Sequence, residues 1–291
     1  MPESTPSARP PRVWTVFLAS FAALCGAFAI QAVVGAALAI TMIASGADPQ
    51  TLAEELIPKL MHPAVFLGML LLSQSMFWLA GFIPAKMSPE PTSQRLGLVA
   101  SRASWMQYVL FALGSVLPLM VSVGAATLVA KLIKPDESLL MLYQQMDNTW
   151  AIPFIVLIGV VPGFVEEMLF RGYVQPRLIA RWGPAPGIVV TSILFAICHI
   201  TPHAMALAFI MGLWLGLLAW KTGSIWPGAV CHAFVNSSWN VWQVGQYIWG
   251  FPKSLPTIVN VAGLCIMTLL FAWAAWSAIK IRPEEISPEL A

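Results

Sequence analysis

The stretch WAIPFIVLIGVVPGFVEEMLFR, residues 150–171, decides how this chain folds. Residues 150–165 contain no charged side chain, and they are followed by two adjacent glutamates, Glu166 and Glu167, and then by Arg171. About 20 consecutive apolar residues are enough for one α-helix to cross the ~30 Å hydrocarbon core of a bilayer. The stretch therefore predicts a membrane span, over Trp150–Phe170, with a cluster of charges at its end.

The composition of the whole chain indicates the same class of protein. Of its 291 residues, 58% are apolar and 10% are charged, and the net charge is +2. Soluble domains contain about 25% charged residues, so too few charges remain here to cover a soluble surface. The same composition excludes a disordered chain, a disulfide scaffold and a basic nucleic-acid binder. We therefore expect an all-α polytopic helical bundle whose surroundings are a lipid bilayer, with no nucleic-acid partner.

Eight apolar stretches are read as transmembrane helices, and the fifth and sixth of them are short. They are Val13–Ile43, Ala64–Ala85, Trp105–Val129, Trp150–Phe170, Gly187–Ile200, Met205–Trp220, Ile225–Ile248 and Pro256–Ile279. With eight spans, 11 of the 15 Lys and Arg residues fall on the side of the two termini and 4 on the other side. Because cytoplasmic loops carry the excess of Lys and Arg, this split predicts that both termini are cytoplasmic. Gly212 and Gly216 form a GxxxG pattern, which is typical of close helix packing.

The two adjacent glutamates are the only acidic residues inside the predicted spans, and they have different surroundings. Glu167 and Arg171 are four residues apart, so they share a helix face and can form an ion pair. Glu166 is rotated by about 100° and has no such local cation. A salt-bridge network at the helix end explains Glu167 and Arg171 but not a second acid. Since ionisable groups inside a membrane usually mark function, Glu166 is predicted to accept a proton.

Further polar side chains occur in two later spans. His199 follows Phe195 by four residues, so one helix face presents an aromatic ring and an imidazole. His232, Asn236 and Asn240 are also spaced by four and form a polar stripe. Such groups can hold a water molecule or donate hydrogen bonds to an oxyanion. For Asn240, one turn further along, contact between helices is the favoured role.

The absence of other sequence motifs narrows the chemistry. The sequence contains no GxSxG, no HExxH and no Asp within a predicted span. These absences disfavour a serine hydrolase, a zincin and an intramembrane aspartyl protease. The groups that are present suit activation of water and stabilisation of a tetrahedral intermediate.

In order, these motifs resemble the signature of a known family. Glu166-Glu167-x-x-x-Arg171, Phe195-x-x-x-His199 and His232-x-x-x-Asn236 are similar to the three motifs of the CAAX-protease and bacteriocin-processing (CPBP, or Abi) family. The eukaryotic branch of this family is the type II CAAX prenyl endoprotease. The resemblance covers about residues 150–245, and it implies an eight-span bundle with a conical cavity that opens to the membrane and the cytosol.

The resemblance also implies roles for the residues. Glu166 would be the general base, with His199 helping to hold the water, and His232 with Asn236 would form the oxyanion site. Glu167 and Arg171 would support the helix end, and Phe195 would line the pocket. The implied reaction is hydrolysis of a peptide bond near the cytoplasmic membrane surface, in a peptide or protein substrate that is lipidated in the eukaryotic branch.

A zinc-dependent mechanism is an open alternative, because Glu166, His199 and His232 could supply three zinc ligands with water in the fourth position. A metal-free, glutamate-dependent mechanism needs the same residues.

The predicted spans, the charge split and the resemblance together divide the chain into four parts. These are a cytoplasmic N-terminal tail (1–12), N-terminal transmembrane helices (13–149), catalytic core helices (150–248), and a last transmembrane helix with a cytoplasmic C-terminal tail (249–291). A bacterial inner membrane is the expected location.

Two other functions are compatible with the composition. One is a non-catalytic immunity or scaffold protein that uses the same fold to bind a partner, since fold does not fix function. The other is a proton-coupled transporter, because buried Glu and His also form proton relays. The polar groups gather near span ends and do not trace a route across the membrane, which disfavours transport. The four motif residues Glu166, His199, His232 and Asn236 favour the protease.

Overall fold

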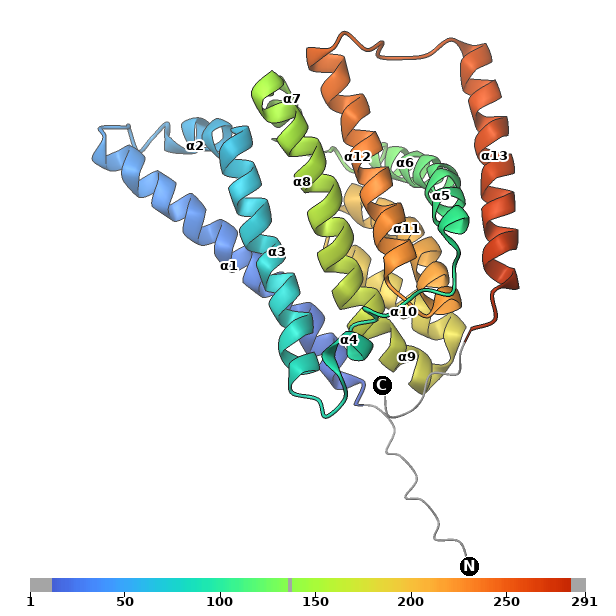
Figure 1. Cartoon of the computed structure of the whole chain (residues 1–291). Helices are drawn as coiled ribbons and strands as arrows, with labels where there is room; N and C mark the ends of the chain where they lie inside the picture. The colour runs from blue at the N-terminus through green and yellow to red at the C-terminus, as the bar shows by residue number, and fades with distance from the viewer. Residues whose placement is uncertain (1–11, 136–137, 284–291) are drawn as a thin grey trace, which may run out of the picture.

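The computed structural model describes residues 12–135 and 138–283, and within these ranges the chain forms helices and no strands (Figure 1). The predicted tails, 1–12 and the end of 249–291, lie almost wholly outside the described residues. The elements are α1 (Trp14–Ala44), α2 (Leu52–Leu60), α3 (Pro63–Lys86), α4 (Thr92–Arg95), α5 (Trp105–Gly114), α6 (Val116–Ala130), α7 (Ser138–Gln144), α8 (Asn148–Glu167), the π-helix η1 (Met168–Val174), α9 (Gln175–Trp182), α10 (Pro184–Ile197), α11 (Pro202–Thr222), α12 (Trp226–Ile248) and α13 (Thr257–Lys280).

The predicted polytopic helical bundle is confirmed. Among the described residues, six helical segments are long and apolar enough to cross a membrane: α1, α3, α5 with α6, α8 through α9, α11 and α13. The other two predicted spans also form helices but differ from these six. Helix α10 is shorter, with 14 residues, whereas α12 has 23 residues and is not among the six. The polar stripe of His and Asn in α12 accounts for its lower hydropathy.

The fourth predicted span extends further than expected. It was predicted to end at Phe170, but the helical segment runs on through η1 and α9 to Trp182. The polar residues beyond Phe170 do not end it because they are buried and bonded within the bundle. Arg177, for example, is 5% exposed and donates to the Tyr173 carbonyl at 2.6 Å. Glu166 consequently lies close to the middle of a 35-residue segment and not at its end.

Local sequence signals explain where several helices begin. Asp147 caps α8 by accepting hydrogen bonds from the backbone N–H groups of Thr149 and Trp150. Ser104 forms a capping box with Gln107 at the start of α5. A short turn joins α10 to α11, with Pro202 in the first position of the second helix. This turn folds α11 back against α10.

Small residues allow the helices that carry the site to approach closely. A Cβ atom on Gly163 of α8 would lie 2.8 Å from the backbone nitrogen of Ala233 in α12. On α11, a Cβ on Gly212 would lie 3.0 Å from Ser192 of α10, and one on Gly216 would lie 2.7 Å from Gln175. The close packing predicted from the GxxxG pattern is therefore confirmed. These contacts fix α8, α10, α11 and α12 around one polar centre.

The outer helices present apolar side chains outward, as expected beside lipid. Only Ala274 and Ala278 of α13 are buried, whereas Trp273 and Leu269 are largely exposed. Helix α1 begins, and α13 ends, at the same end of the bundle (Figure 1). This arrangement agrees with an even number of crossings.

Candidate active site

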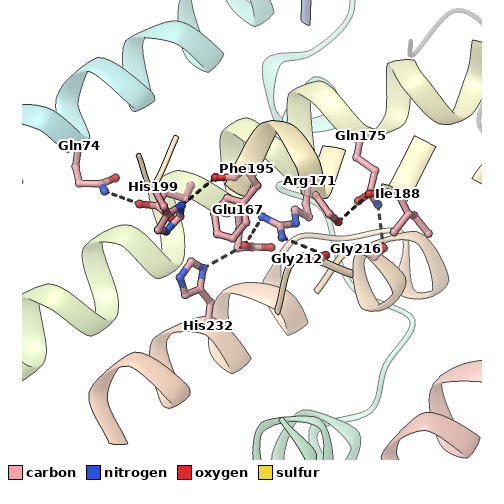
Figure 2. A network of polar contacts seen from close by, with 12 residues as sticks. Gln74, Glu167, Arg171, Gln175, Ile188, Phe195, His199, Gly212, Gly216 and His232 are labelled. Atoms are coloured by element: carbon pink, nitrogen blue, oxygen red, sulfur yellow. Dashed lines mark hydrogen bonds and ion pairs between the residues drawn. The ribbon is translucent and has the colours of Figure 1, made fainter. Parts of the chain in front are cut away.

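The two glutamates lie at the junction of α8 with the π-helix η1. Helix α8 ends at Glu167, and the π-helical segment runs over Met168–Val174. Short π-helical segments are rare, and they are frequent at functional sites because they change the direction of the side chains that follow. Here the segment carries Arg171, whose side chain turns back toward Glu167 (Figure 2).

Glu167 is the centre of a fully buried charged group. Its Oε1 atom lies 2.9 Å from Arg171 Nη1 and 3.2 Å from His232 Nδ1, and the side chains of Glu167 and Arg171 are 0% exposed. The ion pair predicted from the four-residue spacing is thus confirmed, and His232 joins it from α12. Arg171 also donates to the carbonyl of Gly212 at 3.3 Å.

The contact with Glu167 constrains the proton on His232. An ionised carboxylate only accepts hydrogen bonds, so Nδ1 of His232 carries the proton in this contact. A second donor at Nε2 then requires the imidazolium form. Glu167 supplies the negative charge that such a form would need nearby.

Glu166 points away from this charged group and meets a different partner. Its Oε1 atom accepts a hydrogen bond of 2.7 Å from Nε2 of Gln74, a residue of α3. Its Oε2 atom is buried and has no hydrogen-bond partner among the described residues. A buried acceptor without a donor costs about 1–3 kcal/mol, and more when it is charged. One oxygen is therefore held in place while the other is available to a water molecule or a substrate.

A cavity of about 260 Å³ lies in front of Glu166. It is bounded by α1, α3, the end of α8 and the turn after α10, and its polar lining includes Glu166, Gln74 and His199. Much of the remaining wall is apolar and includes Phe66 and Phe77. The structure therefore brings two of the predicted catalytic residues, Glu166 and His199, to one cavity.

His199 lies in the turn directly after α10 and is oriented by a backbone carbonyl of that helix. Its Nδ1 atom lies 2.9 Å from the carbonyl oxygen of Phe195, so Nδ1 donates and Nε2 is left for other contacts. The Phe195 ring packs edge-on against both imidazoles, with centroids 4.8 Å from His199 and 5.9 Å from His232. The Arg171 guanidinium lies 4.4 Å from the same ring. Phe195 thus contacts both imidazoles, but neither Phe195, which was predicted to line the pocket, nor His232 is among the residues that line the Glu166 cavity.

The structure does not bring Asn236 to the cavity. Its Nδ2 atom donates to the carbonyl of Ile158 on α8 at 3.4 Å, and Asn236 is not among the lining residues. Asn240 donates to the carbonyl of Asn236 and accepts from the Tyr143 hydroxyl at 2.8 Å. Both asparagines therefore make contacts that hold helices together.

Burial raises the pKa of Tyr143, in α7, above its ordinary value.

The residues suggested as zinc ligands are not assembled for that purpose. Within the described parts of the chain, no three His, Cys, Asp or Glu side chains form a group that could hold a metal ion. We therefore assign no zinc ligands and derive no step that uses a metal.

Two polar residues that contact the site or its supporting helix were not predicted from the sequence. Gln74 interrupts the apolar run of α3, and a polar residue within a span was the only signal that could have marked it. Gln175 donates to the carbonyl of Gly216 at 2.9 Å, four residues beyond the contact between Arg171 and Gly212. The matching spacing of these two pairs could have indicated that η1 lies along α11.

Comparison with protein families gives one match. Residues 148–238 match the family model described as Rce1-like, type II CAAX prenyl endopeptidase Rce1-like. This match supports assignment of the chain to the CPBP/CAAX protease family. Comparison with curated proteins and with solved structures gives no match.

The match suggests the activity at a coarse level. Proteins described by this family model are CAAX-type proteases, which supports an intramembrane protease at family level. The matched segment contains both glutamates, Arg171 and both motif histidines. Gln74, on α3, lies outside it.

Proposed function

We propose that this protein is an intramembrane endopeptidase in which Glu166 activates the attacking water. The observation that carries this proposal is the cavity that contains Glu166 and His199, in which one carboxylate oxygen is held by Gln74 and the other has no hydrogen-bond partner among the described residues. A general base must lie within hydrogen-bond reach of the proton that it removes. The free oxygen of Glu166 meets that condition for a water molecule held in the cavity.

In the proposed reaction, Glu166 acts first as a general base and then as a general acid. Glu166 takes a proton from water while the water oxygen forms a bond to the carbonyl carbon of the scissile peptide. The resulting tetrahedral oxyanion then collapses, and the protonated Glu166 gives its proton to the leaving amine nitrogen. His199 orients the water through its Nε2 atom, because Nδ1 is engaged by the backbone.

We assign stabilisation of the oxyanion to His232, supported by Glu167 and Arg171. The buried contact of Nδ1 with Glu167 fixes the ring, and Nε2 is a donor in the imidazolium form of His232. Removing one donor of this kind costs a factor of roughly 10²–10³ in rate in well-studied hydrolases. The resemblance to the family makes Asn236 a second donor to the oxyanion. To take this role, its Nδ2 atom would have to leave its 3.4 Å contact with the carbonyl of Ile158.

The apolar walls of the cavity favour the proposal that the substrate carries an apolar group. Aromatic residues of α1 and α3, including Phe28, Phe66 and Phe77, line the space beside Glu166. Such walls suit a peptide that carries an isoprenoid or another apolar group. We propose that the substrate is a lipidated peptide and that the enzyme works in a bacterial inner membrane. The excess of Lys and Arg on the side of the two termini supports cytoplasmic termini. Two of the residues on that side, Arg171 and Arg177, are buried inside the bundle.

Peptide cleavage by the purified protein in detergent tests the function. The substrates are a quenched prenylated peptide ending in a CAAX sequence and the same peptide without the prenyl group. The variants are His199→Gln and, as a matched control, His203→Gln. His203 lies four residues further on and is bonded to the carbonyl of Ile133, away from the cavity.

We expect cleavage of the prenylated peptide by the wild-type protein and by His203→Gln, and at least a hundredfold loss in His199→Gln. Equal cleavage by the two variants would contradict the assigned site. Binding of the peptide without cleavage would instead favour the scaffold function.

A further inference from the structure

One face of α3 forms a wall of the Glu166 cavity. The residues of α3 that line the cavity recur every three or four positions, and they are Phe66, Met69, Leu70, Ser73, Gln74 and Phe77. This spacing places them along one side of the helix. Ser73 and Gln74 are polar, whereas the lining residues one turn before and one turn after them are apolar. The wall therefore carries a short polar band, Ser73 with Gln74, between two apolar regions.

The polar band contains buried atoms with unused hydrogen-bonding capacity. Ser73 is 9% exposed and Gln74 is 7% exposed, and neither Ser73 Oγ nor Gln74 Oε1 has a hydrogen-bond partner among the described residues. Serine hydroxyls in helices often donate to the carbonyl four residues earlier, as Ser122 does to Pro118 at 2.7 Å. Because buried polar atoms are rarely left unpaired, two such atoms on adjacent residues of one cavity wall indicate that a ligand supplies their partners.

Glu166 determines which way the Gln74 amide points. An ionised carboxylate only accepts hydrogen bonds, so the amide nitrogen of Gln74 faces it, 2.7 Å from Glu166 Oε1. The remaining amide atom, Gln74 Oε1, can only accept. Ser73 differs from it, because a hydroxyl can donate as well as accept. The polar band therefore offers one acceptor and one group that can donate.

We propose that the polar band binds the main chain of the substrate peptide beside the scissile bond. In this arrangement Gln74 Oε1 accepts a hydrogen bond from a backbone N–H, and Ser73 Oγ donates one to a backbone carbonyl. Every residue other than proline carries one backbone N–H donor and one C=O acceptor, which is the complement of the pair on α3. The inference rests on the proposed function, because it places the substrate of that reaction in the Glu166 cavity.

The size of the cavity agrees with binding of a short stretch of main chain. Its volume is about 260 Å³, and sites for drug-sized ligands have roughly 300–1,000 Å³. The apolar regions on both sides of the polar band then face the apolar groups of the substrate. Main-chain hydrogen bonds are the same for all residues except proline, so this contact holds the peptide whatever its side chains.

Binding of a fluorescent prenylated peptide ending in a CAAX sequence, followed by anisotropy in detergent, tests the inference. The protein is the full chain with Glu166→Gln, which keeps the contact with Gln74 and leaves the peptide intact. Ser73→Ala and Gln74→Met are each added to it, with Ser75→Ala as the matched control. Ser75 Oγ donates to the carbonyl of Leu72 at 2.6 Å, and Ser75 does not line the cavity. The peptides are the parent and analogues in which one backbone N–H at a time is replaced by an ester oxygen.

We expect Ser73→Ala to weaken binding of the parent peptide about tenfold and Ser75→Ala to change it by less than about twofold. One ester analogue should bind about tenfold more weakly than the parent, and this difference should fall below about twofold with Gln74→Met, because the acceptor is then gone. The inference is overturned by unchanged binding in Ser73→Ala, by an equal loss in Ser75→Ala, by an ester effect that persists with Gln74→Met, or by a parent peptide that does not bind.

Cleavage of the parent peptide by the wild-type protein is measured in parallel and separates the two proposals. The expected binding pattern without cleavage would contradict the proposed function and support binding of the main chain by α3. Cleavage without the expected binding pattern would support the proposed function and overturn the inference.

Discussion

Replacing Glu167 by glutamine is expected to lower the free energy of unfolding by about 3 kcal/mol. Both side chains of the Glu167–Arg171 pair are 0% exposed, and the charged atoms are 2.9 Å apart. At an effective dielectric constant near 20, two unit charges at that distance attract each other by about 6 kcal/mol. Breaking one side of a buried pair typically costs about 3–5 kcal/mol, because a charge is left uncompensated. Glutamine keeps an acceptor oxygen for Arg171, which places the expected loss at the lower end of that range.

The assay is equilibrium unfolding in mixed micelles with increasing SDS, followed by circular dichroism. Glu54→Gln, an exposed acid of α2, is the control and is expected to change the free energy by less than about 0.5 kcal/mol. The double variant Glu167→Gln/Arg171→Met removes both charges, so its loss should be smaller than the sum of the two single losses. A loss below about 1 kcal/mol in Glu167→Gln, or strict additivity in the double variant, would refute the reasoning.

Three further predictions follow from other contacts. Gln74→Met removes the donor that holds Glu166, so cleavage should fall about tenfold or more in a peptide assay while Tm changes little. Gly163→Val places a side chain against the backbone of α12 and should destabilise the protein by about 1–3 kcal/mol in SDS unfolding. Tyr143→Phe leaves the Asn240 oxygen without its donor and should cost about 1–3 kcal/mol in the same assay. Because burial raises the pKa of Tyr143 in the folded state, its contribution is present below its ordinary pKa of 10 and is lost as the pH rises above that value.

Each of these three has its own control or contrary result. Ser75→Ala, next to Gln74 but outside the lining of the cavity, should keep full activity, and an equal loss in both variants would remove Gln74 from the site. Unchanged unfolding of Gly163→Val would show that α8 and α12 are further apart than described. Between pH 9 and 11, wild-type stability should approach that of Tyr143→Phe, and a constant gap would contradict the stated pKa direction.

Local spacing predicted the contacts that lie within one helix. The ion pair between Glu167 and Arg171 follows from a separation of four residues and is confirmed at 2.9 Å. The opposite orientation of Glu166 follows from the 100° rotation between neighbouring residues. The helical bundle itself follows from composition, because so few charges are available for a water-exposed surface.

Contacts between distant segments could not be predicted in the same way. Gln74 and Glu166 are 92 residues apart, and Glu167 and His232 are 65 apart, so no periodicity links them. The extension of the fourth predicted span beyond Phe170 could not be predicted, because the charge of Arg171 ends the apolar stretch in the sequence. In the structure Arg171 is buried and satisfied by Glu167 and by a backbone carbonyl of α11.

The central claim is that the carboxylate of Glu166 activates water, and the turnover number of Glu166→Gln tests it most directly. Glutamine keeps the size of the side chain and the contact with Gln74 but cannot accept a proton from water. With the folded fraction matched to the wild type and the prenylated peptide at saturation, kcat should fall by a factor of about 10²–10⁴, with KM little changed. A kcat within threefold of the wild-type value would contradict the assignment.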